Sequence, residues 1–126
     1  MTGGVTFDAG ALIALDRNDR RVLTLVARTR ERGMRITVPA TALAQAIRNP
    51  ARQVRLSRFI RQVGTNLVAL DGKDATEVGL LLARTGKSDV VDAHVVVCAR
   101  RASQAVVTSD HDDLKKLAPE IPAIVV

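Results

Sequence analysis

Aromatic residues and cysteines are almost absent from the sequence. Phe7 and Phe59 are its two aromatic side chains, so the core must be built from Val, Leu, Ile and Ala. So few aromatic residues also exclude base stacking as the main means of binding a single-stranded nucleic acid. The one cysteine, Cys98, excludes an internal disulfide and is typical of a protein from a reducing compartment.

The sequence also has no signal peptide and no apolar run long enough to span a bilayer. We therefore expect a cytoplasmic protein with no membrane partner. Its 126 residues, of which 47% are apolar and 25% charged, have the size and composition of one globular domain with a sizeable core. We predict a single domain over residues 1–126.

Charge is unevenly distributed along the chain, whose formal net charge is +6. The arginine-rich stretch from Arg17 to Arg61 holds only two acids, Asp19 and Glu31, whereas residues 88–113 hold five aspartates and two arginines. A basic first half and a later acid cluster indicate a surface for a polyanion beside a site for a cation. A solvated, arginine-rich exterior explains the same distribution equally well.

The stretch from Ser88 to Arg101 predicts a buried helix, because it is apolar on nearly every side. Its first turn nevertheless carries Asp89 and Asp92, which a spacing of three residues places on one helix face. With Ser88 as the N-cap, an acid near the helix N-terminus accounts for Asp89. Asp92 lies among apolar residues, where a carboxylate needs a counter-charge or a metal. This segment alone leaves both a capping role and a metal or catalytic role open.

Strands alternate with helices along the chain. Short apolar runs predict strands at residues 5–7, 35–38, 66–70, 104–108 and 123–126. Helical patterns occupy residues 9–15, 19–32, 39–49, 51–63, 74–84, 88–101 and a short segment around 114–117. Asp19 is predicted to cap the second helix, and Asp71 and Asp74 are predicted to be turn or capping acids. This alternation predicts an α/β fold whose parallel sheet is covered on both faces.

Two aspartates, Asp8 and Asp110, come at the carboxyl ends of predicted strands. These strand ends lie at one edge of a parallel sheet, and the helix at 88–101 can bring Asp92, with Asp89, to the same edge. Carboxylates that converge with no Lys or Arg among them repel one another unless they bind a divalent cation. An oxygen-only ligand set suits Mg²⁺ or Mn²⁺. The sequence therefore predicts a metal site at this edge.

Four short motifs, in order and over essentially the whole chain, resemble those of PIN-domain proteins, most of all the VapC-type ribonuclease toxins of bacterial toxin–antitoxin pairs. They are Val5-Thr6-Phe7-Asp8-Ala9, Val38-Pro39-Ala40, Ser88-Asp89-Val90-Val91-Asp92-Ala93 and Val107-Thr108-Ser109-Asp110. The resemblance implies a three-layer α/β/α sandwich with a central parallel sheet. It also implies a Mg²⁺- or Mn²⁺-dependent endoribonuclease that hydrolyses RNA phosphodiester bonds, forms a homodimer and is neutralised by a cognate antitoxin. By position, Asp8, Asp92 and Asp110 correspond to the family's metal-binding and catalytic acids.

One position departs from the family pattern. PIN-domain proteins usually carry a Glu in the helix after the second strand, and the corresponding residue here is Gln45. A glutamine offers a neutral oxygen or a hydrogen bond but no negative charge. We therefore place Gln45 beside the metal and consider Asp89 and Asp112 as sources of the missing charge.

Further residues are implied around the metal. Asp89 and Asp112 are candidates for holding a second ion or orienting water, although Asp112 also suits the cap of the helix that follows it. Thr108 and Ser109 are expected to steady Asp110 by hydrogen bonds. These residues would support hydrolysis of a phosphodiester bond.

Three arginines are candidates for contacts with RNA phosphates. Arg48, Arg52 and Arg55 have helical spacing and form one basic stripe if the helices on either side of Asn49-Pro50 are collinear. Since aromatic residues are lacking, RNA choice is expected to depend on shape.

Two other functions stay open at the level of the sequence. A non-catalytic PIN-like domain that binds RNA or a protein partner is favoured by Gln45. A phospho-acceptor receiver domain is also α/β with clustered acids, but it pairs its acids early in the chain and needs a Lys after a late strand. His94 and Cys98, four residues apart on one helix face, suggest zinc, yet with no further cysteine we expect a packing role for them.

Overall fold

A five-stranded sheet forms the centre of the protein. The computed structural model describes residues 3–126 and arranges the strands in the order β3–β2–β1–β4–β5, with every neighbouring pair parallel. The strands are β1 (Val5–Phe7), β2 (Ile36–Pro39), β3 (Thr65–Val68), β4 (Ala105–Thr108) and β5 (Ala123–Val125). Because parallel strands need crossover connections, at least one helix separates each strand from the next.

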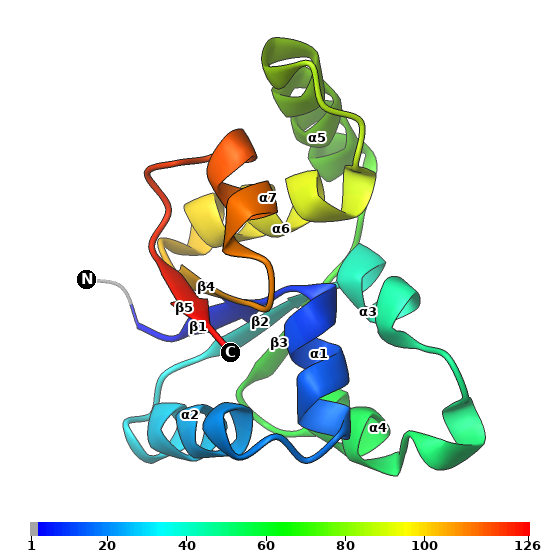
Figure 1. The fold of residues 1–126 in the computed structure, drawn as a ribbon, viewed down its shortest axis with the longest axis vertical. Helices are drawn as coiled ribbons and strands as arrows, with labels where there is room; N and C mark the ends of the chain where they lie inside the picture. Colours follow the sequence, from blue (N-terminus) through cyan, green and yellow to red (C-terminus); the bar gives the residue numbers. More distant parts are fainter. Residues whose placement is uncertain (1–2) are drawn as a thin grey trace.

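Helices cover both faces of the sheet, as the sequence predicted. One face carries α6 with α5 and α7 packed on it, the other carries α1, α2 and α4, and α3 lies between α1 and α6 (Figure 1). The helices are α1 (Ala9–Asp16), α2 (Arg20–Glu31), α3 (Ala40–Ala46), the short 3₁₀ helix η1 (Pro50–Arg52), α4 (Val54–Arg61), α5 (Gly72–Thr85), α6 (Val90–Ala102) and α7 (His111–Leu117). The predicted three-layer α/β/α sandwich is thus confirmed. Among the helices of residues 3–126, none combines the length and apolar character needed to cross a membrane.

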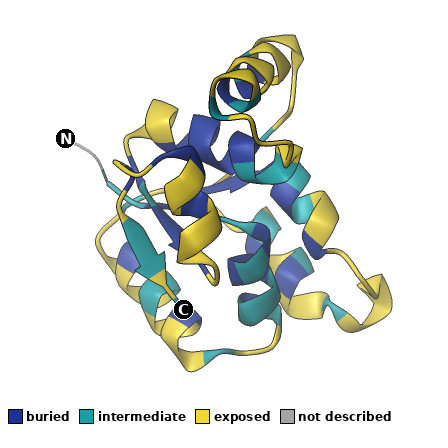
Figure 2. Ribbon diagram, turned by 45° about the horizontal axis from the view of Figure 1, so that its top comes forward, coloured by how far each residue is buried: buried dark blue, intermediate teal, exposed yellow. Residues whose placement is uncertain are grey.

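The core has the aliphatic composition that the sequence predicted. Every residue of α6 from Ala93 to Ala99 is buried, and Figure 2 shows the buried residues, in dark blue, gathered in the middle of the molecule. Valine, leucine, isoleucine and alanine supply almost all other core side chains. The two phenylalanines, Phe7 and Phe59, pack together with 5.2 Å between their ring centroids. Burial of α6 is what brings its acidic first turn against the sheet.

The predicted helix caps are correct at one helix and wrong at another. Asp19 is the N-cap of α2, and its Oδ1 accepts hydrogen bonds from two backbone N–H groups of the first turn. α6, in contrast, starts at Val90 with Asp89 as its N-cap, so the prediction of Ser88 in that role is wrong. The Asp89 carboxylate accepts a hydrogen bond from the backbone N–H of Asp92 at 2.9 Å, and this is the capping bond that had been expected from Ser88.

The predicted helix over residues 51–63 is confirmed for α4 and wrong in its extent. The chain forms η1 first and then α4, with a break at Gln53. The side chain of Gln53 bonds the segment between α3 and η1: its Oε1 accepts from the backbone N–H groups of Arg48 and Asn49, and its Nε2 donates to the carbonyl of Ala46. An amide that satisfies three backbone groups of that segment stabilises the turn there.

Asp71 and Asp74, both predicted as turn or capping acids, have different roles. Asp71 is the N-cap of α5 and accepts from the Asp74 backbone N–H at 2.9 Å, as predicted. Asp74 itself is only 2% exposed. Its carboxylate binds His94 and Arg101, so the prediction of a simple cap is wrong at this position.

Candidate active site

Three aspartates begin helices near the carboxyl edge of the sheet. Asp8 follows β1 and caps α1, Asp110 follows β4 and caps α7, and Asp89 caps α6. β1 and β4 are neighbours, and the Asp8 backbone N–H donates to the carbonyl of Val107 at 3.1 Å. The ends of these two strands therefore lie side by side, with an acid at each.

A small cavity of about 30 Å³ lies between these helix starts. Its lining residues are Asp8, Asp92, Val95, Val106, Asp110, Asp113 and Leu114. The structure thus brings together Asp8, Asp92 and Asp110, the three aspartates that the sequence singled out. It adds Asp113 as a fourth, and no Lys or Arg is among the lining residues.

A second, more open depression of about 250 Å³ adjoins the acid cavity. Its lining residues are Lys87, Ser88, Asp89, Asp92, Asp113, Lys116 and Leu117. Asp92 and Asp113 line both hollows, so the two are neighbours that share these side chains. The sequence analysis did not identify the two lysines, Lys87 and Lys116, because neither belongs to a motif or a spacing typical of a binding site.

The carboxylates repel one another. Burial raises the pKa of Asp92 from 3.8 to about 6, and the negative charges of Asp89, Asp113, Asp8 and Asp110 add to the rise. Each cause acts in the same direction, since both desolvation and nearby like charge disfavour the ionised form. No basic side chain lowers the pKa of Asp92, so this carboxylate lacks the counter-charge that a buried carboxylate requires.

Asp8 has a raised pKa for a related reason. Burial is the largest cause and the charge of Asp110 a smaller one, while hydrogen bonds from Thr108 and from the Ala11 backbone N–H partly offset them. Thr108 also accepts the backbone N–H of Asp110 at 2.9 Å, so one hydroxyl contacts both acids. The predicted supporting role of Thr108 therefore fits its contacts, although it bonds the main chain of Asp110 and not its carboxylate.

Close packing beside Asp8 depends on Gly10 and Ser109. A Cβ atom added at Gly10 would lie 2.0 Å from Ser109 Oγ and 3.5 Å from Asp8 Oδ1. A side chain at position 10 would therefore require the Ser109 hydroxyl to rotate away, and its Cβ would still lie a tight 3.1 Å from Ser109 Cβ. Ser109 thus contacts the start of α1, the helix that Asp8 caps.

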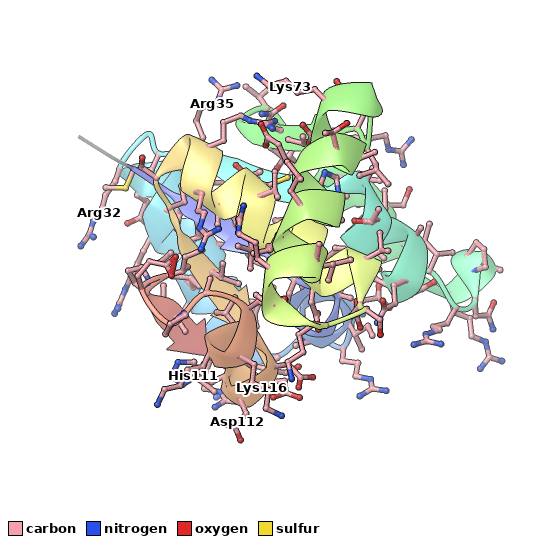
Figure 3. All side chains as sticks on the ribbon, turned by 90° about the horizontal axis from the view of Figure 1, so that it is seen from above. Arg32, Arg35, Lys73, His111, Asp112 and Lys116 are labelled. Carbon is pink, nitrogen blue, oxygen red and sulfur yellow. The ribbon has the colours of Figure 1, made fainter. Side chains whose placement is uncertain are left out.

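Asp112 and Asp113 differ in position. Asp113 lines the acid cavity, and its backbone N–H donates to Asp110 Oδ1 at 3.3 Å. Asp112 is exposed and is not among the lining residues, and Figure 3 shows Asp112 and His111 on the outer side of α7. The predicted capping role of Asp112 is wrong, because the N-cap of α7 is Asp110.

The remaining predicted site residues lie outside the acid cavity. Gln45 is exposed on α3 and is not among the residues that line the cavity. Arg48, Arg52 and Arg55 are exposed but belong to a segment that is broken at Gln53, so they do not form the single helical stripe that collinear helices would give.

The donor set of the acid cavity fits a hard divalent cation. Four carboxylates supply only oxygen atoms, which are the ligands that Mg²⁺ and Mn²⁺ take in proteins. Burial and, to a smaller extent, neighbouring carboxylates raise the pKa of Asp8 and of Asp92, so a bound cation would favour the ionised forms that these surroundings disfavour.

Comparisons with known proteins support the fold. The sequence matches no family model and no curated protein sequence. A chain of the VapBC2 complex from Rickettsia felis, solved bound to a DNA fragment from its promoter, has a TM-score of 0.69 and 13% identity, with 98% of each chain covered. A chain of a toxin–antitoxin complex from Klebsiella pneumoniae has a TM-score of 0.70 and 13% identity, with 96% of each chain covered. FitAcB from Neisseria gonorrhoeae has a TM-score of 0.62 and 13% identity, over 95% of this chain and 96% of that one. At such low identity the likeness establishes a shared fold, and it extends over nearly the whole chain.

Proposed function

We propose that the protein is a metal-dependent endoribonuclease of the VapC type, the toxin of a toxin–antitoxin pair. One observation carries the proposal: four carboxylates, Asp8, Asp92, Asp110 and Asp113, line one cavity with no basic side chain among them. One similar structure is titled a toxin–antitoxin complex and another is VapBC2, which supports the same proposal.

The residues of the cavity suit hydrolysis of a phosphodiester bond. Asp8, Asp92, Asp110 and Asp113 would hold Mg²⁺ or Mn²⁺, with Asp89 beside them. When bound, such an ion lowers the pKa of water and balances charge on phosphate oxygens. Thr108 fixes the relative positions of Asp8 and Asp110 through its two hydrogen bonds.

The substrate would enter from the adjoining depression. Lys87 and Lys116 line it next to Asp89 and Asp92, so cationic and anionic groups meet at its floor. The ammonium groups can bind RNA phosphates while the carboxylates face the scissile bond. Lys87→Ala and Lys116→Ala are therefore expected to weaken RNA binding without weakening metal binding.

Cleavage assays test the proposal directly. Asp8→Asn, Asp92→Asn and Asp110→Asn should each abolish Mg²⁺- or Mn²⁺-dependent cutting of a panel of structured RNAs, while circular dichroism shows an intact fold. Asp112→Asn, an exposed aspartate of α7 outside the cavity, is the matched control and should cut normally. If the three site variants cut at the wild-type rate, the assignment is wrong.

The proposed partners are a cognate antitoxin and a second copy of the chain. An apolar groove of about 170 Å³ runs between α3 and α4. Its lining residues are Leu43, Ile47, Pro50, Gln53, Leu56, Ser57 and Ile60. The exposed Arg48, Arg52 and Arg55 are sequence neighbours of these lining residues, so an acidic amphipathic segment of an antitoxin would suit this surface. The same arginines are our candidates for RNA contacts. Measuring how their substitution changes RNA binding and antitoxin binding separately distinguishes the two roles.

A PIN-like domain with weak or no catalysis is the second candidate. It is favoured by Gln45, which stands where the family usually has a Glu. In that case both the wild type and the aspartate variants would bind RNA, and neither would show metal-dependent cleavage.

A further inference from the structure

A second cluster of potential metal ligands is buried away from the acid cavity. Asp74, His94 and Cys98 each offer one ligand atom, and these atoms all lie within 4.8 Å of one another. Their exposed fractions are 2%, 0% and 2%, so the cluster is closed off from solvent. It combines oxygen, nitrogen and sulfur donors, unlike the oxygen-only set of the acid cavity.

The two helices present these side chains in a fixed arrangement. His94 and Cys98 are four residues apart on α6 and therefore lie on one face. Asp74 comes from the first turn of α5, which packs against α6. His94 follows Asp92 by two residues, a rotation of about 200° around the helix, so the two sites are on opposite sides of α6.

The orientation of the histidine ring is also set from outside the cluster. His94 Nδ1 lies 2.7 Å from the hydroxyl of Thr41 on α3, while Nε2 faces Asp74 Oδ2 at 2.9 Å. A metal-binding histidine typically donates its second ring N–H to an oxygen partner, which fixes the ring and the tautomer. Thr41 is placed to be that partner, with Nε2 left to face the ligand site.

The charges around the cluster balance a divalent ion. Asp74 Oδ1 pairs with Arg101 at 2.6 Å, and Arg101 also pairs with Glu77 at 3.0 Å. With the ion bound, its two positive charges and that of Arg101 would match the negative charges of Asp74, Glu77 and the Cys98 thiolate. The thiol proton would pass to solvent, so binding should weaken as the pH falls.

From this arrangement we infer that Asp74, His94 and Cys98 form a binding site for a zinc-like divalent cation that ties α5 to α6 and is distinct from the acid cavity. A mixed Cys, His and carboxylate set is typical of Zn²⁺. In the metal-free protein the hydrogen bond between His94 and Asp74 occupies the place of the ion, and binding exchanges that bond for two metal–ligand bonds. The same three residues do not make a nucleophilic site, because burial raises the pKa of the Cys98 thiol to about 12 and keeps it protonated.

Cobalt titration tests the site with a signal that the acid cavity cannot give. Chelator-stripped, reduced full-length protein is titrated with Co²⁺ and then with Zn²⁺. One equivalent of Co²⁺ should produce the near-ultraviolet absorption of a Co²⁺–thiolate bond, and Zn²⁺ should bleach it. Cys98 is the only cysteine, so the band reports this residue alone. Absence of the band in the wild-type protein overturns the inference, whatever the outcome of the cleavage assays.

Three variants assign the ligands. Cys98→Ser should lose the band and the Zn²⁺-induced rise in melting temperature, and Thr41→Val should weaken Zn²⁺ binding by about 10- to 100-fold. Asp8→Asn, a variant of the acid cavity, should retain both signals. Cys98→Ala serves in the same way if the serine variant does not fold. Equal Zn²⁺ affinity in wild type and folded Cys98 variants, or loss of the band in Asp8→Asn, would refute the site.

Discussion

Neutralising Asp92 should stabilise the metal-free protein at neutral pH. Asp92→Asn keeps the shape of the side chain and removes a charge that the structure leaves without a basic partner. Because the pKa of Asp92 is raised in the folded state from 3.8 to about 6, the folded protein binds this proton more tightly than the unfolded chain does. The contribution of Asp92 to the stability of the wild type is therefore fully present below pH 3.8 and is lost as the pH rises through about 6. The variant has no such loss.

The size of the effect follows from the same rise in pKa. A change from 3.8 to about 6 corresponds to an upper limit of about 3 kcal/mol. Asp92 is partly solvated, and screening by water reduces this to about 1.5 kcal/mol. The first turn of α6 favours a negative charge by about 0.5 kcal/mol, which the variant gives up. We therefore expect a net gain of about 1 kcal/mol, or a rise in melting temperature of about 4 °C for a chain of this length.

Thermal melts in a chelator at pH 4 and pH 7.5 measure this difference. The gain should be present at pH 7.5 and nearly absent at pH 4, where Asp92 is protonated in the folded wild type. Asp112→Asn, an exposed acid outside the cavity, is the control and should gain nothing at either pH. Saturating Mn²⁺ should reverse the order, because a ligand that binds the folded wild type more tightly stabilises it more. Equal melting temperatures of wild type and Asp92→Asn at pH 7.5 would refute the reasoning.

Three further predictions concern the surroundings of the site. Gly10→Ala should lower the free energy of unfolding, measured in thermal melts, by about 1–2 kcal/mol and should lower cleavage, because the added Cβ would lie 2.0 Å from the Ser109 hydroxyl. The control is Gly79→Ala in α5, where nothing lies within 4 Å of the added Cβ, and it should be neutral or stabilising. RNA affinity should fall with salt at a log–log slope of about −0.7 per phosphate contact for single strands, and Arg52→Ala and Arg55→Ala should flatten it. An unchanged slope assigns these arginines to another partner. Because Gln45 is exposed and does not line the acid cavity, Gln45→Glu should leave Mn²⁺ affinity in calorimetric titrations and the metal-free melting temperature unchanged, and tighter Mn²⁺ binding would place its side chain at the acids.

The sequence predicted the architecture because local signals and the global fold agree. Alternating strand and helix patterns, the mostly apolar stretch of α6 and the capping aspartate Asp19 each predicted an element that the structure contains. Strand ends were right to within two residues because short buried strands are bounded by polar or glycine-rich turns.

The error at Asp74 lies where distant side chains decide local structure. The burial of Asp74 depends on His94 and Arg101, which are 20 and 27 residues further along the chain. Neither contact leaves a periodic pattern in the sequence, so an ordinary capping acid was the natural expectation at Asp74.

Asp113 was missed for a different reason, and the reason bears on how the acid site is built. In α6 the acids occupy the N-cap and the third helical position, Asp89 and Asp92, and α7 repeats this arrangement with Asp110 and Asp113. Which of two adjacent aspartates faces the cavity depends on where the helix starts, and one residue of difference would have selected Asp112 instead. The N-cap positions also explain how a metal-free cluster is tolerated, since each helix N-terminus stabilises nearby negative charge by about 0.3–1 kcal/mol. Capping and metal binding are therefore compatible roles for these aspartates: the helix starts position the carboxylates and partly offset their repulsion, and the remaining excess of charge is what a cation would neutralise.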